Sequence, residues 1–203
     1  MRFLLSITAG LTMAFTSFAG FAAGDIPAGK AAAATCMGCH GAPGMRNAYP
    51  AFRIPKLGGQ QAEYLVPALK AYQSGERVHP TMQAQAGALS DAEITNIAAY
   101  LSSLDAPATS ELGDGDAKAG EAKAQVCTSC HGAGGGKPIT PQYPILVGQY
   151  PDFLAHALAG YKSGARNNAV MKGFASALSD SDIEDLAAYF GSQSSTLSTP
   201  VNW

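Results

Sequence analysis

The feature that most constrains the fold is a Cys-x-x-Cys-His segment that occurs twice. Cys36–His40 reads CMGCH, and Cys127–His131 reads CTSCH 91 positions later. All four cysteines of the 203-residue chain lie in these two segments. Further matches follow at an offset of 89, among them Met82 with Met171. Because self-similarity at a fixed period indicates structural repeats, the sequence predicts two copies of one small domain.

The change of offset from 91 to 89 marks two extra residues in the first copy. The P-x-L-x-G-Q stretch at 55–60 matches 144–149 at the smaller offset. Pro50 and Pro141, in contrast, both lie ten residues after the histidine of their copy. The extra residues are therefore placed at 53–54, Arg and Ile.

Each copy is predicted to hold three helices joined by long loops, and no strand-like alternation competes, so the fold class is all-α. Ser90 with Glu93 forms a capping box that starts the last helix of the first copy, and Ser179 with Asp182 forms a weaker one in the second. Pro67 should kink the middle helix of the first copy or shift its start. The expected helices are 28–39, 62–73 and from 90 onward in the first copy, then 117–130, 151–162 and from 179 onward in the second.

The first 22 residues have the pattern of a secretory signal peptide, with a basic start, an apolar stretch and small residues before a cut at Ala23. The mature chain is expected to be exported and soluble. Its net charge is slightly negative, which argues against a nucleic-acid partner. The predicted organisation is a signal peptide at 1–22, domains at 23–104 and 117–191, a linker at 105–116 and a flexible tail at 192–203.

The Cys-x-x-Cys-His spacing is the signature of c-type haem attachment. Two cysteines on one helical turn can bond the two vinyl groups of a porphyrin, and the next residue places an imidazole under the iron. A zinc site or a redox dithiol fits worse, because the two pairs lie 91 positions apart and no βαβ pattern surrounds them. The sequence therefore predicts two covalently bound haem c groups. The attachment residues are Cys36, Cys39, Cys127 and Cys130, and the proximal iron ligands are His40 and His131.

A methionine is expected as the second axial ligand, which closes the iron and favours electron transfer. Met82 and Met171 match each other in the repeat, each in a predicted loop between the middle and last helices. His79 is a rival ligand in the first copy, but its counterpart is Asn168. His156 also has no histidine counterpart and is expected to serve packing or surface roles.

Two further sets of matched residues suggest how the haem groups are held. A proximal histidine usually donates its second ring N–H to a backbone acceptor, and the carbonyls of Pro50 and Pro141 are candidates. Arg77 and Arg166 precede the two methionines at matching positions. Their guanidinium groups either neutralise haem propionates or lie solvated at the surface.

The tandem CxxCH, the P-x-L-x-G-Q stretch, the late methionine and the LSD-x-x-I-x-x-x-A-A-Y helix resemble the dihaem cytochrome c4 family. This resemblance implies two tandem class I cytochrome c domains related by pseudo-twofold symmetry, with their haem edges facing each other. It also implies His/Met ligation, which carries over to His40 with Met82 and His131 with Met171. The implied function is that of a periplasmic electron carrier, not an enzyme, between quinol–cytochrome c reductase and a terminal oxidase. Such carriers associate loosely with the inner membrane.

Two other functions stay open. The chain could be the electron-transfer subunit of a larger dehydrogenase such as a flavocytochrome, with the catalytic site on another chain. A dihaem peroxidase needs one accessible iron, whereas both copies offer a methionine.

Charge differs between the halves: residues 23–108 carry six basic and six acidic groups, and residues 109–203 carry six basic and nine acidic groups. We therefore hypothesise that the halves meet different partners and that the two haems differ in potential.

Overall fold

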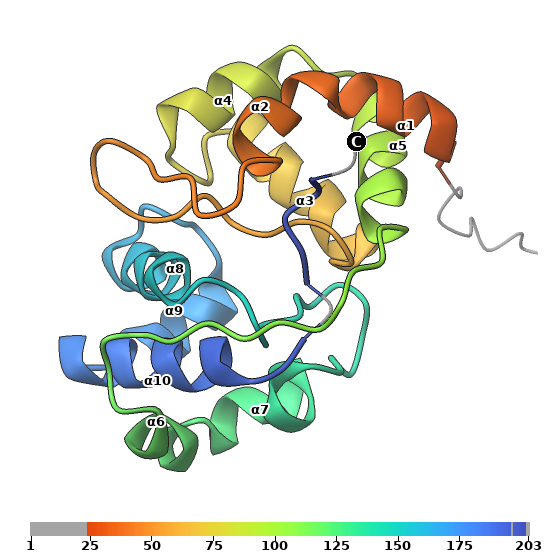
Figure 1. Cartoon of the computed structure of the whole chain (residues 1–203). Coiled ribbons are helices and arrows are strands. Elements are labelled where there is room, and N and C mark those ends of the chain that lie inside the picture. Colours follow the sequence, from red (N-terminus) through yellow and green to blue (C-terminus); the bar gives the residue numbers. More distant parts are fainter. Residues whose placement is uncertain (1–23, 196, 202–203) are drawn as a thin grey trace, which may run out of the picture.

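The computed structural model describes residues 24–195 and 197–201, and the predicted signal peptide at 1–22 lies outside them. Two helical domains lie one above the other, joined by the segment between α5 and α6 (Figure 1). Within the described ranges, the backbone outside the helices forms only isolated β-bridges, so the all-α class is confirmed. No helix in this part of the chain is long and apolar enough to cross a membrane.

The first domain holds five α-helices and one 3-10 helix in the described residues. In chain order they are α1 (Ile26–Ala32), η1 (Ala33–Thr35), α2 (Met37–His40), α3 (Ala62–Gln73), α4 (Pro80–Gly87) and α5 (Asp91–Ser102). The second domain has the same order of α-helices, but its 3-10 helix follows the second α-helix instead of preceding it. Its elements are α6 (Ala117–Lys123), α7 (Gln125–His131), η2 (Ala133–Gly135), α8 (Pro151–Ser163), α9 (Ala169–Ala175) and α10 (Asp180–Ser192).

The first and last helices of each domain cross in close contact, α1 against α5 and α6 against α10. A glycine lies at each crossing because the backbones approach too closely for a side chain. A Cβ at Gly29 would collide with the carbonyl of Asn96, and one at Gly120 would collide with the carbonyl of Asp185. The repeat therefore preserves the contact that frames each domain.

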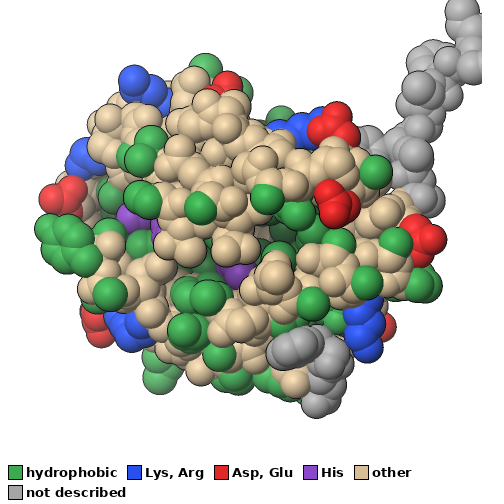
Figure 2. Space-filling view, turned by 90° about the horizontal axis from the view of Figure 1, so that it is seen from above, with side chains coloured by type: hydrophobic (Ala, Val, Ile, Leu, Met, Phe, Trp, Pro, Cys, Tyr) green, Lys and Arg blue, Asp and Glu red, His purple; other side chains and the backbone are tan. Residues whose placement is uncertain are grey.

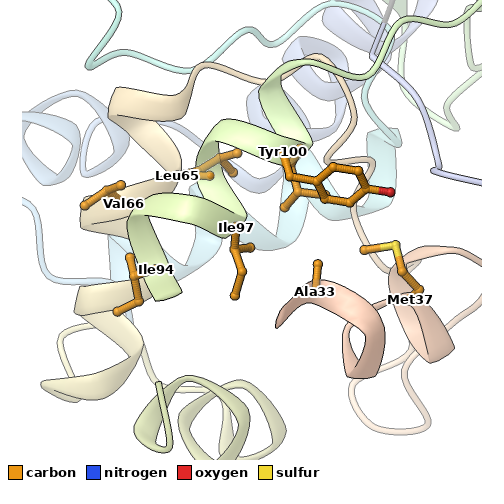
Figure 3. Close-up of a cluster of buried hydrophobic side chains, with 9 residues drawn as sticks. Ala33, Met37, Leu65, Val66, Ile94, Ile97 and Tyr100 are labelled. Carbon is orange, nitrogen blue, oxygen red and sulfur yellow. The ribbon is translucent and has the colours of Figure 1, made fainter. Parts of the chain in front are cut away.

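Each domain has its own hydrophobic core. In the first, side chains from α3 and α5 meet those that flank the CMGCH segment, and Met37 between the two cysteines is only 2% exposed (Figure 3). Ile94 and Ile97 of α5 are fully buried at its centre. In the second, α8 and α10 supply the equivalent core through Leu154, Ile183, Leu186 and Phe190. These cores fix α2 and α7, which carry the two motifs.

The helix predictions are confirmed in part. The expected first helices, 28–39 and 117–130, are each divided, into α1, η1 and α2 in the first domain and into α6 and α7 in the second. Both capping boxes are present, at Ser90 with Glu93 and at Ser179 with Asp182. Helix α3 begins at Ala62 as expected and runs past Pro67 without interruption. The expected loops after the middle helices instead contain α4 and α9, so each domain has a further helix. Neither helix is evident from the sequence. Helix α4 combines Ala, Gly and polar residues without an apolar stripe, and the seven residues of α9 are too few to establish a helical period.

The domains meet in an arrangement that the repeat makes reciprocal. The Val78 N–H donates to the Ala165 carbonyl at 2.9 Å, and the Asn167 N–H donates to the Glu76 carbonyl at 2.7 Å. These four positions are pairwise related by the offset of 89. Such an exchange of equivalent bonds is the mark of a twofold interface. The predicted pseudo-twofold relation is thus present in the hydrogen bonds themselves.

The segment after α10 returns to the first domain (Figure 1). Ser195 pairs with Thr109 of the linker, and Ser198 pairs with Gly58 of the first domain. Leu197 between them is only 1% exposed. The described part of the predicted flexible tail therefore packs across both domains, held by backbone bonds that a Ser/Thr-rich composition does not reveal.

Candidate haem sites

The two motif histidines lie at the ends of α2 and α7 and are buried, with His40 7% and His131 6% exposed. The Nδ1 of His40 lies 3.0 Å from the Pro55 carbonyl oxygen. The Nδ1 of His131 lies 2.9 Å from the Pro144 carbonyl oxygen. A hydrogen bond from Nδ1–H fixes each ring and leaves Nε2 as the free ligand atom.

These acceptors correct the expectation that Pro50 and Pro141 supply the carbonyls. The prolines that do so begin the P-x-L-x-G-Q stretch, at the offset of 89 rather than 91. The extra residues of the first copy precede Pro55, so equal distance from the histidine is the wrong guide. What the repeat preserves is the register of the segment that carries the acceptor.

Burial also favours the neutral imidazole that an iron ligand must be. Desolvation lowers the pKa of His40, opposed by the hydrogen bond to Pro55. The pKa of His131 is lowered for the same reason, against the bond to Pro144. Both rings are therefore available as uncharged ligands at neutral pH.

None of the four cysteines forms a disulfide with a described residue, and all four are partly exposed. Cys39 lies on α2 and Cys36 is the N-cap of that helix, whereas Cys127 and Cys130 both lie on α7. Among the described residues, no group of three or more His, Cys, Asp or Glu side chains gathers as a metal site would require. Two unpaired thiols beside one oriented imidazole, repeated once per domain, fit covalent haem c.

The two matched methionines lie on α4 and α9 and are partly buried. Each helix is capped by the residue three positions earlier, which accepts a bond from the methionine N–H. His79 does this with Nδ1 at 3.2 Å from the Met82 nitrogen, and Asn168 does it with Oδ1 at 2.9 Å from the Met171 nitrogen. His79 therefore performs the same task as Asn168, which argues against it as a rival iron ligand.

Arg77 and Arg166 lie at the contact between the domains, where their backbones form an antiparallel bridge. Arg77 donates to the Tyr64 hydroxyl at 3.1 Å, and the Arg166 guanidinium lies 5.5 Å from the centre of the Tyr161 ring. Arg166 is 8% exposed, so the solvated alternative is wrong for it. Neither guanidinium forms an ion pair with a carboxylate of the described residues.

Burial raises the pKa of the Tyr64 phenol, but the two guanidinium groups outweigh it and the pKa is lowered. Since Arg77 belongs to the first domain and Arg166 to the second, the two guanidinium groups together make this part of the domain contact electropositive. Such a site favours anionic groups, because a buried guanidinium without a counter-charge is costly.

Several residues at the domain interface have roles that no pattern in the sequence indicates. Lys56 is 4% exposed, and its ammonium group contacts Glu111 at 2.8 Å and the Gly148 carbonyl at 2.8 Å. Phe52 stacks on His156, with ring centres 3.9 Å apart, which confirms a packing role for that histidine. Only cross-domain contacts give these residues their roles, and no motif within one copy encodes them.

Two family models match the chain, one on each domain. "Cytochrome c" matches residues 26–105, and "Cytochrome C oxidase, cbb3-type, subunit III" matches residues 115–190. Cytochrome c4 of Pseudomonas aeruginosa is 34% identical over 191 residues, which cover 88% of this chain and 93% of the relative. The chain belongs to the cytochrome c4 family. It is a dihaem c-type cytochrome with His/Met ligation, an electron carrier and not an enzyme.

The fold of a cytochrome c4 agrees with that of this chain. The crystal structure of reduced recombinant cytochrome c4 from Pseudomonas stutzeri aligns with a TM-score of 0.69 at 32% identity, covering 84% of this chain and all of that one. A second relative has a different name. The thiosulfate dehydrogenase electron acceptor of Stutzerimonas stutzeri is 34% identical over 173 residues, 78% of this chain and 79% of the relative.

Proposed function

We propose that the two haem groups are held by matching sets of residues, one per domain. Supporting this are the bonded, buried histidines and the helices that present methionines at one shared offset. The set in the first domain is Cys36, Cys39, His40 and Met82. The set in the second is Cys127, Cys130, His131 and Met171. The haem supplies a one-electron couple at iron. The chain's own residues would orient the imidazole through its hydrogen bond to a proline carbonyl and would offer a methionine thioether as the second protein ligand, which raises the potential.

Arg77 and Arg166 face the haem carboxylates in this proposal. Both guanidinium groups lack a carboxylate partner among the described residues, although they sit at the contact between two domains that each bind a dianionic cofactor. Substituting Arg166 by Gln should lower both haem potentials, since loss of a buried positive charge stabilises the ferric form.

The carrier functions in the periplasm, between a quinol-oxidising complex and a terminal oxidase, with loose association at the inner membrane. The signal-peptide pattern and family membership support this placement. Exposed apolar side chains lie close to the proposed methionine ligands, among them Val78, Val170 and Phe174. On the face seen in Figure 2, charged groups lie toward the edge and histidine is visible only in recesses. Exposed apolar side chains near the proposed ligands suit weak, transient docking.

A second candidate donor is thiosulfate dehydrogenase. One relative at 34% identity is named as the electron acceptor of that enzyme. The same two-haem architecture would serve this role, because the donor's chemistry takes place on another chain. The electron-transfer subunit of a flavocytochrome would also receive electrons from a catalytic site on another chain, but no relative named here supports that role.

Stopped-flow reduction of the oxidised protein separates the two donors. We expect fast reduction by a quinol-oxidising complex with quinol, and slow reduction by thiosulfate dehydrogenase with thiosulfate. The reverse order would assign the protein to thiosulfate oxidation.

Repeating the series across ionic strength tests the charge difference between the halves: identical salt dependence at both haems would contradict separate partners.

A further inference from the structure

Two buried glutamines cross the domain interface and bind each other's domain. Gln60 and Gln149 end the two P-x-L-x-G-Q stretches, and each is 4% exposed. The Gln60 amide donates to the Ile145 carbonyl at 3.0 Å and accepts from the Ile145 N–H at 2.9 Å. The Gln149 amide makes the same pair of bonds with Lys56, both at 2.9 Å. Each side chain thus fixes both backbone groups of one residue in the opposite domain.

Each glutamine binds the residue that directly follows the proline whose carbonyl faces a motif histidine. Ile145 follows Pro144, whose carbonyl accepts from His131, and Lys56 follows Pro55, whose carbonyl accepts from His40. One peptide unit therefore joins the glutamine contact to the histidine contact: its C=O orients the imidazole, and its N–H donates to the glutamine of the other domain. A peptide unit is planar, so its two ends cannot turn independently.

We propose that Gln60 and Gln149 are positioning residues that act crosswise. Gln60 of the first domain sets the hydrogen bond to His131 in the second, and Gln149 of the second sets the hydrogen bond to His40 in the first. The inference rests on the proposed assignment of these histidines as the proximal ligands. Its consequence is that docking of the domains tunes the potential of each haem through the partner domain.

The direction of the effect follows from the chemistry of the proximal ligand. A hydrogen bond from Nδ1–H to a carbonyl makes the imidazole a more basic ligand. A more basic ligand stabilises ferric iron. Losing the glutamine frees the peptide unit, weakens that bond and raises the potential of the haem in the opposite domain.

The two effects should differ in size. Lys56 has additional anchors in its ammonium contacts with Gly148 and Glu111, whereas its counterpart Ile145 has an apolar side chain. Loss of Gln149 is therefore partly compensated, and loss of Gln60 is not. The larger shift is expected at the haem of the second domain.

The test compares Gln60→Leu with Gln149→Leu in the full haem-loaded protein by spectroelectrochemical titration. Reference proteins Met82→His and Met171→His, each altering one haem, assign the two couples. At a fixed ambient potential, Gln60→Leu should raise the ferrous-to-ferric ratio of the second-domain haem by up to about tenfold, which is ~59 mV for a one-electron couple. Gln149→Leu should produce a smaller rise at the first-domain haem.

Hydrogen exchange on the same proteins gives a readout that does not depend on the haem couple. Gln60→Leu should remove protection from the Ile145 amide and leave that of Lys56, and Gln149→Leu should do the reverse. If a leucine variant does not fold, Gln60→Asn and Gln149→Asn keep the amide but shorten its reach, and crossed shifts of the same sign are expected.

Shifts confined to the haem in the same domain as the substitution, equal shifts at both haems, or no shift would overturn the inference. The proposed ligands are tested separately on the unaltered protein. If its oxidised form lacks the methionine-to-iron band for two haems, the ligand assignment fails. If that band is complete and the crossed shifts are absent, only the role of the glutamines fails.

Discussion

In both domains, a side chain of the last helix accepts a hydrogen bond from the backbone N–H just before the first helix. The accepting side chain is neutral in one domain and charged in the other. In the first, the Asn96 side chain accepts from the Asp25 N–H at 2.8 Å. In the second, Asp185 accepts from the Asp116 N–H at 2.9 Å and also forms an ion pair with Lys123 at 2.6 Å. The two domains thus share a side-chain acceptor at this position of the last helix, but the acceptor is neutral in the first domain and charged in the second.

The domain interface differs from this pattern because part of it has no twofold counterpart. Arg53, one of the two residues extra to the first copy, donates from Nε to Asp152 at 3.0 Å and from a terminal nitrogen to Glu111 at 3.1 Å. Its guanidinium also lies 4.5 Å from the centre of the Tyr150 ring. The insertion thus adds an ionic contact beside the reciprocal glutamines, and the domains are not interchangeable.

The largest effect is expected where the domains are most alike. Gly29→Ala and Gly120→Ala each force a Cβ against a backbone carbonyl of the facing helix. Overpacking should outweigh the better helix propensity of alanine and reduce the free energy of unfolding by about 2 kcal/mol or more. Calorimetry of the haem-loaded proteins checks this. Gly173→Ala, on α9 with open space around it, serves as the control, and equal stability of all three would refute close crossing.

An intermediate effect is expected from the asymmetric contact. Arg53→Gln removes charge-assisted bonds between partly buried groups, so the free energy of unfolding should fall by about 1–2 kcal/mol. Denaturant unfolding measures the loss. Lys162→Gln breaks an ion pair with Asp180, whose side chain is 97% exposed, and should change stability by less than about 0.5 kcal/mol. Equal losses in the two variants would mean that the Arg53 contact contributes nothing special.

The smallest effect is expected in how stability depends on pH. It distinguishes the charged contact of Asp185 in the second domain from the neutral contact of Asn96 in the first. Lys123 and the Asp116 N–H lower the pKa of Asp185 in the folded protein. Its stabilising contribution is therefore present above the unfolded value of about 4 and is lost as pH falls through the folded value. Asp185→Asn should cost stability at pH 7 and little at pH 2–3. Asn96→Ala should cost the same at both, and a pH-dependent loss there would contradict the neutral contact.

Much of the fold could be predicted from sequence because its signals are local or repeated. The CxxCH segments, the capping boxes at Ser90 and Ser179 and the shared offset of Met82 and Met171 are all read within one copy or by comparing copies. The helices α4 and α9 are not evident from the sequence because, at eight and seven residues, they are too short for a helical period to be recognised.

The carbonyl partners of the histidines were also missed, for a different reason. A backbone acceptor has no side-chain signature, so only the register of the surrounding stretch distinguishes Pro55 from Pro50. The roles of Lys56 and Gln149 lie further out of reach, because the groups they bind belong to segments roughly ninety positions away. Such contacts arise only once the two domains dock.

The most direct test of the account is the near-infrared methionine-to-iron charge-transfer band of the oxidised protein, scaled to total haem. We predict full intensity for two haems, which establishes two closed His/Met centres and a carrier that acts by electron transfer alone. Half intensity or none would show that Met82 or Met171 is not a ligand. An open or differently ligated iron would contradict the account and reopen catalysis at that haem.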